Sequence, residues 1–255
     1  MPAAVDLHRL HWGSPGPAVV LIHGLTGRAA LWSDVATRLA DEGYHVIAPD
    51  LRGHGTSPRP GNYSLEAHTA DVVHLLESTG PACLVGHSLG GAVAWHVAAA
   101  RPDVVRCLVI EDQHPNATTG GWQYWMDWAT SWPLSLPTRE AGIGHLQAEG
   151  RSVDWWSASL EPAKDGTWGW AFDVTAVVES ARSLWETDSW DTLAGLYAPT
   201  MIIRGGLSPH LEGHVAQRMV HTIPHCKLVT IPEADHWVHR DPDPYVKTLL
   251  GFLKP

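Results

Sequence analysis

Short apolar runs alternate with longer stretches of helical periodicity along most of the chain. Runs that are apolar throughout are typical of parallel strands buried on both faces. Strands are predicted at 18–23, 45–50, 82–87, 104–110, 200–205 and 227–232, with a further alternating segment near 5–11, and helices at 29–41, 65–79, 89–100, 209–222 and 243–253. Strands that alternate with helices of this length indicate βαβ units, and therefore an α/β fold with a mostly parallel sheet flanked by helices.

The alternation is interrupted once, by a segment rich in tryptophan. Ten of the 14 tryptophans lie between residues 116 and 190, whereas the whole chain has only 2 phenylalanines. Trp122, Trp125, Trp128 and Trp132 follow one another at steps of three or four residues, which predicts a helix with one aromatic face. We interpret 116–190 as a helical cap, a lid inserted between the sixth and seventh strands of a core formed by residues 1–115 and 191–255.

Composition excludes several classes of protein. With 44% hydrophobic and 17% charged residues among 255, the chain is not disordered, and a net charge of −10 argues against a nucleic-acid surface. No uncharged apolar run approaches the roughly 18 residues of a membrane-spanning helix, and the first residues lack the pattern of a secretory leader. The odd cysteine count, at Cys83, Cys107 and Cys226, matches no disulfide framework or CxxC metal pair, which favours a reducing, cytoplasmic location.

The strongest chemical motif is GHSLG at residues 86–90, which fits G-x-S-x-G. It follows an apolar predicted strand and precedes an alanine-rich predicted helix, the context of a nucleophile elbow. Ser88 would sit in a sharp turn that tolerates only small residues two positions before and after it. The N–H groups at the start of the following helix favour a developing negative charge. We therefore predict that Ser88 is a nucleophile rather than part of a plain glycine turn.

A second glycine-containing segment, HGLTG at residues 23–27, closes another apolar run. A loop at this position can present a backbone N–H group toward Ser88. We expect the N–H groups of Leu25 and of Leu89, the residue after the nucleophile, to form an oxyanion hole. On its own, the segment is equally compatible with a simple turn.

A candidate general base lies near the C-terminus, in the segment IPEADHWVHRDPDP at 231–244. His236 follows the last predicted strand and precedes the last predicted helix, where the chain order serine, acid, histidine places the base. Its imidazole would take the serine proton and return it to the leaving group. His239 is the nearest competitor among 17 histidines. His210 and His214 are four residues apart on a predicted helix, but no further ligand joins them, so we expect a solvated helix face and no metal.

Four segments together resemble the α/β-hydrolase superfamily: HGLTG (23–27), DLRGHGTS (50–57), GHSLGG (86–91) and ADHWVH (234–239). The resemblance extends from about residue 18 to the end of the chain, apart from the lid. It implies the α/β-hydrolase fold with a tryptophan-rich cap after strand 6, a Ser–His–acid triad and no cofactor. It does not imply a substrate.

The sequence departs from this superfamily at the acid. In most members an aspartate follows the seventh strand, but here Ser208 and Pro209 occupy those positions. A second location is the end of the sixth strand, where Glu111 and Asp112 are adjacent. Haloalkane dehalogenases carry a glutamate where Glu111 stands, and Asp112 matches a more widespread aspartate. We prefer Glu111 as the acid, with Asp112 as the alternative. Two other carboxylates stay open: Glu212 and Asp235.

These residues predict a serine hydrolase that cleaves a carboxylic ester or lactone through an acyl-enzyme. The aromatic lid suggests a bulky apolar or aromatic small molecule as substrate, with four candidate contacts: Trp122, Trp125, Trp128 and Trp155. A C–C bond hydrolase, a thioesterase or an amidase would use the same residues. The rival from another class is a non-catalytic ligand-binding homologue. We expect no nucleic-acid or membrane partner, and a monomer or homodimer.

Overall fold

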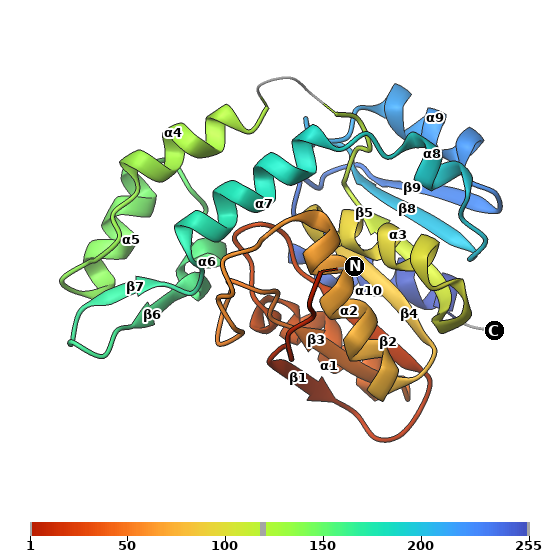
Figure 1. Cartoon of the computed structure of the whole chain (residues 1–255), viewed down its shortest axis with the longest axis horizontal. Coiled ribbons are helices and arrows are strands. Elements are labelled where there is room, and N and C mark those ends of the chain that lie inside the picture. The colour runs from red at the N-terminus through yellow and green to blue at the C-terminus, as the bar shows by residue number, and fades with distance from the viewer. Residues whose placement is uncertain (1, 118–120, 254–255) are drawn as a thin grey trace.

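Figure 1 shows the chain as a computed structural model, which describes residues 2–117 and 121–253 and their side chains except those of residues 154 and 155. Within these residues, seven strands form one sheet in the order β1-β3-β2-β4-β5-β8-β9, and β1 alone runs antiparallel to its neighbour. The strands are β1 (Arg9–Trp12), β2 (Ala18–Ile22), β3 (His45–Pro49), β4 (Ala82–His87), β5 (Val105–Glu111), β8 (Thr200–Gly205) and β9 (Cys226–Ile231).

Helices cover both faces of this sheet (Figure 1). One face packs against α1 (Ser33–Asp41) and α10 (Pro242–Leu253), and the other against α2 (Leu65–Thr79), α3 (Leu89–Ala100), α8 (Trp190–Ala194) and α9 (Gly213–Thr222). Successive strand residues point to opposite faces, so Leu84 of β4 packs on the α2–α3 side and Val85 on the α1–α10 side. Burial on both faces is the reason that the strands read as continuous apolar runs, and the predicted mostly parallel α/β fold is confirmed.

The predicted helices agree closely with the observed ones, apart from the start of α9. Helices α2 and α3 have the predicted bounds, whereas α9 begins at Gly213 and not at residue 209. His210 precedes this helix in a loop, where its backbone N–H donates to Ser208 Oγ at 3.1 Å. The expectation that His210 and His214 share a helix face is therefore wrong, because His210 lies in the loop before the helix, where it lines a cavity described below.

The tryptophan-rich segment lies between β5 and β8 and extends to one side of the sheet (Figure 1). Counted along the chain, β5 is the fifth strand of the described sheet. The insertion therefore follows strand 5 of this sheet, where the prediction numbered the preceding strand as 6. The bounds 116–190 of the cap stay a prediction. Before α8, the segment contains α4 (Gln123–Ser131), α5 (Arg139–Ala148), α6 (Val153–Trp156), β6 (Leu160–Pro162), β7 (Trp168–Trp170) and α7 (Val174–Glu186).

Tilted aromatic rings in mutual contact hold this segment together. Trp132 is the centre of the cluster, with ring centroids 4.6 Å from Trp128, 5.7 Å from Trp156 and 4.7 Å from Trp170. Helix α4 therefore carries the aromatic face that the spacing predicts. Aromatic pairs at these separations add attraction beyond the apolar area they bury, so the insert has a small core of its own.

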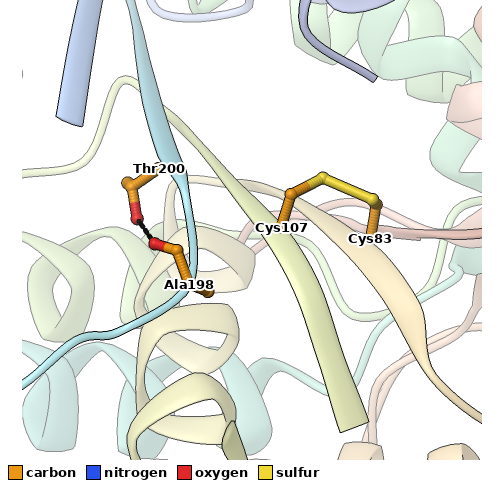
Figure 2. The surroundings of a disulfide bond; sticks show 4 residues. All are labelled: Cys83, Cys107, Ala198 and Thr200. Carbon is orange, nitrogen blue, oxygen red and sulfur yellow. Dashed lines mark hydrogen bonds between the residues drawn. A yellow bond between two sulfur atoms is a disulfide. The ribbon is translucent and has the colours of Figure 1, made fainter. Parts of the chain in front are cut away.

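Two of the three cysteines are paired. Cys83 and Cys107 form a disulfide between the neighbouring strands β4 and β5, where the two residues are direct partners in the register (Figure 2). The expectation from the odd count was wrong, because pairing depends on the order of strands in the sheet. The cysteine pattern therefore gives no support to a cytoplasmic location.

In the part of the chain that the structure describes, no helix is long and apolar enough to cross a membrane. Nor do the described His, Cys, Asp and Glu side chains form a group that could hold a metal ion.

Candidate active site

Ser88 lies in a strained turn between β4 and α3. Its φ of 52° and ψ of −120° are unusual for a residue with a side chain, and such strain is concentrated at functional sites. The turn is possible because its neighbours lack side chains: a Cβ at Gly86 would come within 2.1 Å of Gly90 O, and one at Gly90 within 2.2 Å of Ile22 O. The chain therefore forms the sharp elbow that the GHSLG motif predicts.

The loop after β2 lies directly against this elbow. A Cβ added to Gly24 would come within 3.1 Å of the Ser88 Cβ, so the loop and the serine are in close contact. His54 Nε2 donates to Leu25 O at 2.5 Å and ties the loop to the segment after β3. Among the described residues, the N–H groups of Leu25 and Leu89 have no protein acceptor, which leaves both donors available to a ligand.

His236 follows β9 and lies over the same end of the sheet. Its Nδ1 is 2.8 Å from Oδ2 of Asp112, and its ring lies 4.0 Å from that of His210. His87 Nε2 donates to the backbone carbonyl of His236 at 3.0 Å, which holds the loop that carries His236. Burial lowers the pKa of His236 well below its usual 6.5, and the neighbouring histidines His210 and His239 lower it further. The imidazole is therefore neutral near pH 7, as a proton acceptor must be.

Asp112 follows β5 in a left-handed conformation, with a φ of 48°. Its Oδ1 accepts from the Gly205 N–H at 3.1 Å, and its Oδ2 accepts from the Ser208 hydroxyl as well as facing His236. Burial raises the pKa of Asp112 to about 6, although the hydrogen bonds from Ser208 and Gly205 oppose the rise. These contacts hold the carboxylate against Nδ1 of the base, leaving Nε2 for the substrate side.

Glu111 does not contact His236, so the preferred partner of the base is corrected to the alternative, Asp112. The Glu111 carboxylate accepts from Nδ1 of His239 at 2.6 Å and from the Tyr245 hydroxyl at 2.8 Å. The physical reason is the change of backbone conformation at the end of β5: Glu111 is still a strand residue, whereas the left-handed Asp112 turns its side chain toward Gly205 and Ser208. Burial alone would raise the pKa of Glu111, but the imidazoles of His239 and His87 and these hydrogen bonds outweigh it and hold the pKa below its usual value.

The structure also explains why Ser208 can stand where most superfamily members carry an aspartate. Strands β5 and β8 are parallel neighbours, so their carboxyl ends meet at one edge of the sheet. Asp112 follows one strand and Ser208 the other, and the two side chains are hydrogen-bonded. The two strand ends therefore place Asp112 and Ser208 side by side, with Asp112 also in contact with His236. Glu212, which pairs with His214, and Asp235, which pairs with Arg240, are not at this position.

A cavity of about 180 Å³ joins these groups, and both Ser88 and His236 line it. Of the predicted tryptophan contacts, Trp125 lines the cavity. Trp128 is buried in the aromatic cluster of the insert and Trp122 packs beside it, so neither lines the described cavity. The side chain of Trp155 lies outside the described residues.

Sequence reasoning missed several residues of this cavity. Gln113 and His114 follow Asp112, Trp237 follows His236, and His210 lies in the loop after β8. The signal that could have found them is proximity: each stands within two residues of a predicted site residue or of the displaced acid position at Ser208. Trp156 carries the same signal, since it follows the predicted contact Trp155. Trp185 carries none, because its position depends on how the insert folds.

A serine in a strained elbow, a buried histidine and an aspartate on that histidine, at the carboxyl edge of a mostly parallel sheet, define the α/β-hydrolase class of enzyme. The comparison with known families agrees. Residues 19–248 match the alpha/beta hydrolase family, and the chain belongs to that family.

Named relatives cover nearly the whole chain. The sn-1-specific diacylglycerol lipase ABHD11 of Mus musculus is 31% identical over 99% of this chain and 86% of its own length. The 2-(acetamidomethylene)succinate hydrolase of Mesorhizobium japonicum is 28% identical over 93% of this chain and 88% of its own. The crystal structure of an E-2-(acetamidomethylene)succinate hydrolase superposes with a TM-score of 0.87 at 27% identity, covering 97% and 94% of the two chains. The chain is thus a hydrolase with lipases and other hydrolases among its relatives.

Proposed function

We propose that this enzyme hydrolyses a carboxylic ester or lactone of an apolar or aromatic small molecule through an acyl-enzyme on Ser88. The observation that carries the proposal is the hydrogen bond between His236 Nδ1 and Asp112, on a histidine that lines the same cavity as Ser88. The chemistry needs no cofactor. Since the cavity measures about 180 Å³, below the roughly 300–1,000 Å³ typical for drug-sized ligands, we narrow the expected bulky group to one ring or a short chain.

The reaction proceeds in two halves. Ser88 Oγ forms a bond to the carbonyl carbon while His236 Nε2 takes its proton, and the carbonyl oxygen becomes an anion held by the N–H groups of Leu25 and Leu89. The carbon–oxygen bond to the leaving group breaks, and His236 returns the proton to that oxygen. Water then attacks the acyl carbon, giving its proton to His236, and Ser88 leaves with a proton. Asp112 stabilises the imidazolium in both halves.

The experiment that tests the function is labelling with a fluorophosphonate, followed by peptide mass spectrometry. We expect one phosphonylated residue, Ser88, and no label in Ser88→Ala, while Ser14→Ala on an exposed loop labels normally. Absence of label in the wild type would favour a non-catalytic binder.

The substrate class is tested with a panel of 4-nitrophenyl esters of rising acyl length and with lactones, thioesters and anilides of matched acyl groups. Because the cavity is small, we expect kcat/KM to be highest for acetyl to butyryl esters or small-ring lactones and to fall about tenfold or more at octanoyl. Thioesters or anilides that outperform the matched esters would assign the alternative thioesterase or amidase activity.

The pH dependence follows from the pKa of Asp112, which burial raises to about 6. Protonated Asp112 cannot stabilise the imidazolium, so kcat/KM should fall as the pH drops through about 6 and be level above pH 7. Ser208→Ala removes a hydrogen bond to the ionised form and should move this limb to higher pH by about half a unit to one unit, since such a bond is worth about 1 kcal/mol. Initial rates from pH 4.5 to 9, with Ser14→Ala as the control, measure the shift; a limb displaced to lower pH would contradict the assignment.

A further inference from the structure

One cation faces the cavity from the insert. Arg151, in the loop between α5 and α6, is the single arginine or lysine among the described residues that line the cavity. The other basic groups there are histidines, and burial lowers the pKa of five of them: His23, His87, His114, His210 and His236. A guanidinium stays protonated throughout the physiological pH range, so Arg151 supplies a permanent positive charge to that lining.

The guanidinium has no acidic partner in the described chain, where no carboxylate lies within 4 Å of it. Nη2 donates to the Tyr124 hydroxyl at 2.7 Å, and the guanidinium carbon lies 5.3 Å from the centre of the Trp156 ring. Nε is buried and has no hydrogen-bond partner. A buried donor without an acceptor is unfavourable unless a ligand satisfies it.

The contacts of Arg151 position it for a particular kind of ligand. The Tyr124 hydroxyl and the Trp156 ring hold the planar group while leaving Nε and other N–H donors unused. Adjacent N–H donors of a guanidinium match the two oxygens of a carboxylate. Tyr124 is 53% exposed, so this end of the cavity reaches solvent and an anion entering it keeps part of its hydration.

Aromatic rings connect this cation to the proposed catalytic base. The ring of Trp237 lies 5.4 Å from that of His236, and the ring of Trp156 lies 6.4 Å from that of Trp237. The Arg151 guanidinium in turn lies over the Trp156 ring. The cavity thus has a reactive end at Ser88 and His236, an apolar wall of two indoles, and a cationic end.

We propose that Arg151 is a specificity-determining residue that binds a carboxylate of the substrate, so that the preferred substrate is an ester or lactone carrying a carboxylate across a short apolar or aromatic spacer. The inference rests on the proposed hydrolytic function and names the substrate class of that site.

The test compares substrates that differ only in charge. The first pair is 4-acetoxybenzoate and 4-acetoxybenzamide, in which the carboxylate or carboxamide lies on the leaving group. The second pair is 4-nitrophenyl hydrogen adipate and its terminal amide, in which the carboxylate or carboxamide lies on the acyl group. For at least one pair, the wild type should favour the carboxylate in kcat/KM, chiefly through KM. In Arg151→Met this preference should fall by about 10- to 100-fold, the range for hydrogen bonds to a charged group. Arg151→Lys keeps the positive charge but not the two adjacent N–H donors, so it should lose less of the carboxylate preference than Arg151→Met.

The matched control is Arg182→Met, which removes an exposed arginine of the insert that does not line the cavity. It should keep the wild-type preference. Equal rates for both members of each pair in the wild type, or an equal loss for both in Arg151→Met, would overturn the carboxylate site, and the second outcome would assign Arg151 a structural role.

A binding measurement separates this proposal from the hydrolytic one. Titration calorimetry of the wild type should show tighter binding of 4-ethylbenzoate than of 4-ethylbenzamide, and Arg151→Met should abolish the difference. If no ester is hydrolysed but this difference is present, the hydrolytic function fails and the carboxylate site stands. If esters are hydrolysed and the two ligands bind equally or not at all, the carboxylate site fails alone.

Discussion

Asp112→Asn should lower kcat/KM by about three orders of magnitude or more while leaving the fold intact, because the amide neither stabilises the imidazolium nor holds the reactive tautomer of His236. The carboxylate contacts His236 Nδ1 at 2.8 Å. Since burial raises the pKa of Asp112, its ionised form is costly to the fold, and the neutral amide should leave the melting temperature unchanged or raise it. Steady-state kinetics and thermal unfolding of the same preparation measure both quantities.

A double variant sharpens this expectation. Ser208 stands at the superfamily's usual acid position and is hydrogen-bonded to Asp112, so a carboxylate at residue 208 would lie beside the same imidazole. Asp112→Asn combined with Ser208→Asp should therefore recover at least about tenfold of the activity lost in Asp112→Asn. Full activity in Asp112→Asn alone would show that another group serves the base.

Glu111→Gln should have the opposite effects to Asp112→Asn. It should destabilise the protein, and it should retain more of the wild-type activity than Asp112→Asn does. Glu111 is completely buried, and its carboxylate accepts from His239 and Tyr245. Replacing a buried carboxylate that accepts several hydrogen bonds costs about 3 kcal/mol, which corresponds to a fall in melting temperature of roughly 6–12 °C for a domain of this size. The expected loss in kcat is within about tenfold, since the carboxylate does not touch His236.

The pH dependence of stability gives an independent readout for Glu111. Its folded pKa lies below its usual 4.5, so its contribution to the free energy of unfolding is present at neutral pH and is lost as the pH falls below about 4.5. Glu111→Gln should remove that dependence. Tyr245→Phe, which deletes one hydrogen bond, should cost only about 1 kcal/mol. A Glu111→Gln protein with wild-type stability and a thousandfold lower kcat would restore Glu111 as the acid.

Several parts of the fold were predictable because their signals are local. The bounds of α2 and α3 agree with the predicted ones, since each helix has clear flanking residues and faces the buried sheet. The elbow at Ser88 was also predictable, because its geometry depends on small residues within two positions of the serine. In contrast, α9 starts later than its periodicity suggests, because the Ser208 loop takes part in the site.

Other features depend on which strands are neighbours. The Cys83–Cys107 disulfide exists because β4 and β5 pair in that register, which no cysteine spacing reveals. In the same way, β5 and β8 end side by side, and this brings Asp112 and Ser208 together although 96 residues separate them.

The sequence by itself determined the α/β-hydrolase class, and it singled out Ser88 and His236 as the candidate nucleophile and base, because short motifs with fixed backbone requirements carry that information. Only the tertiary structure distinguished Asp112 from Glu111, since adjacent residues of one chain diverge by the direction of their side chains. It also decided which rings of the insert face the cavity, and it placed Arg151 there without an acidic partner. These outcomes depend on packing between distant segments, which no local pattern records.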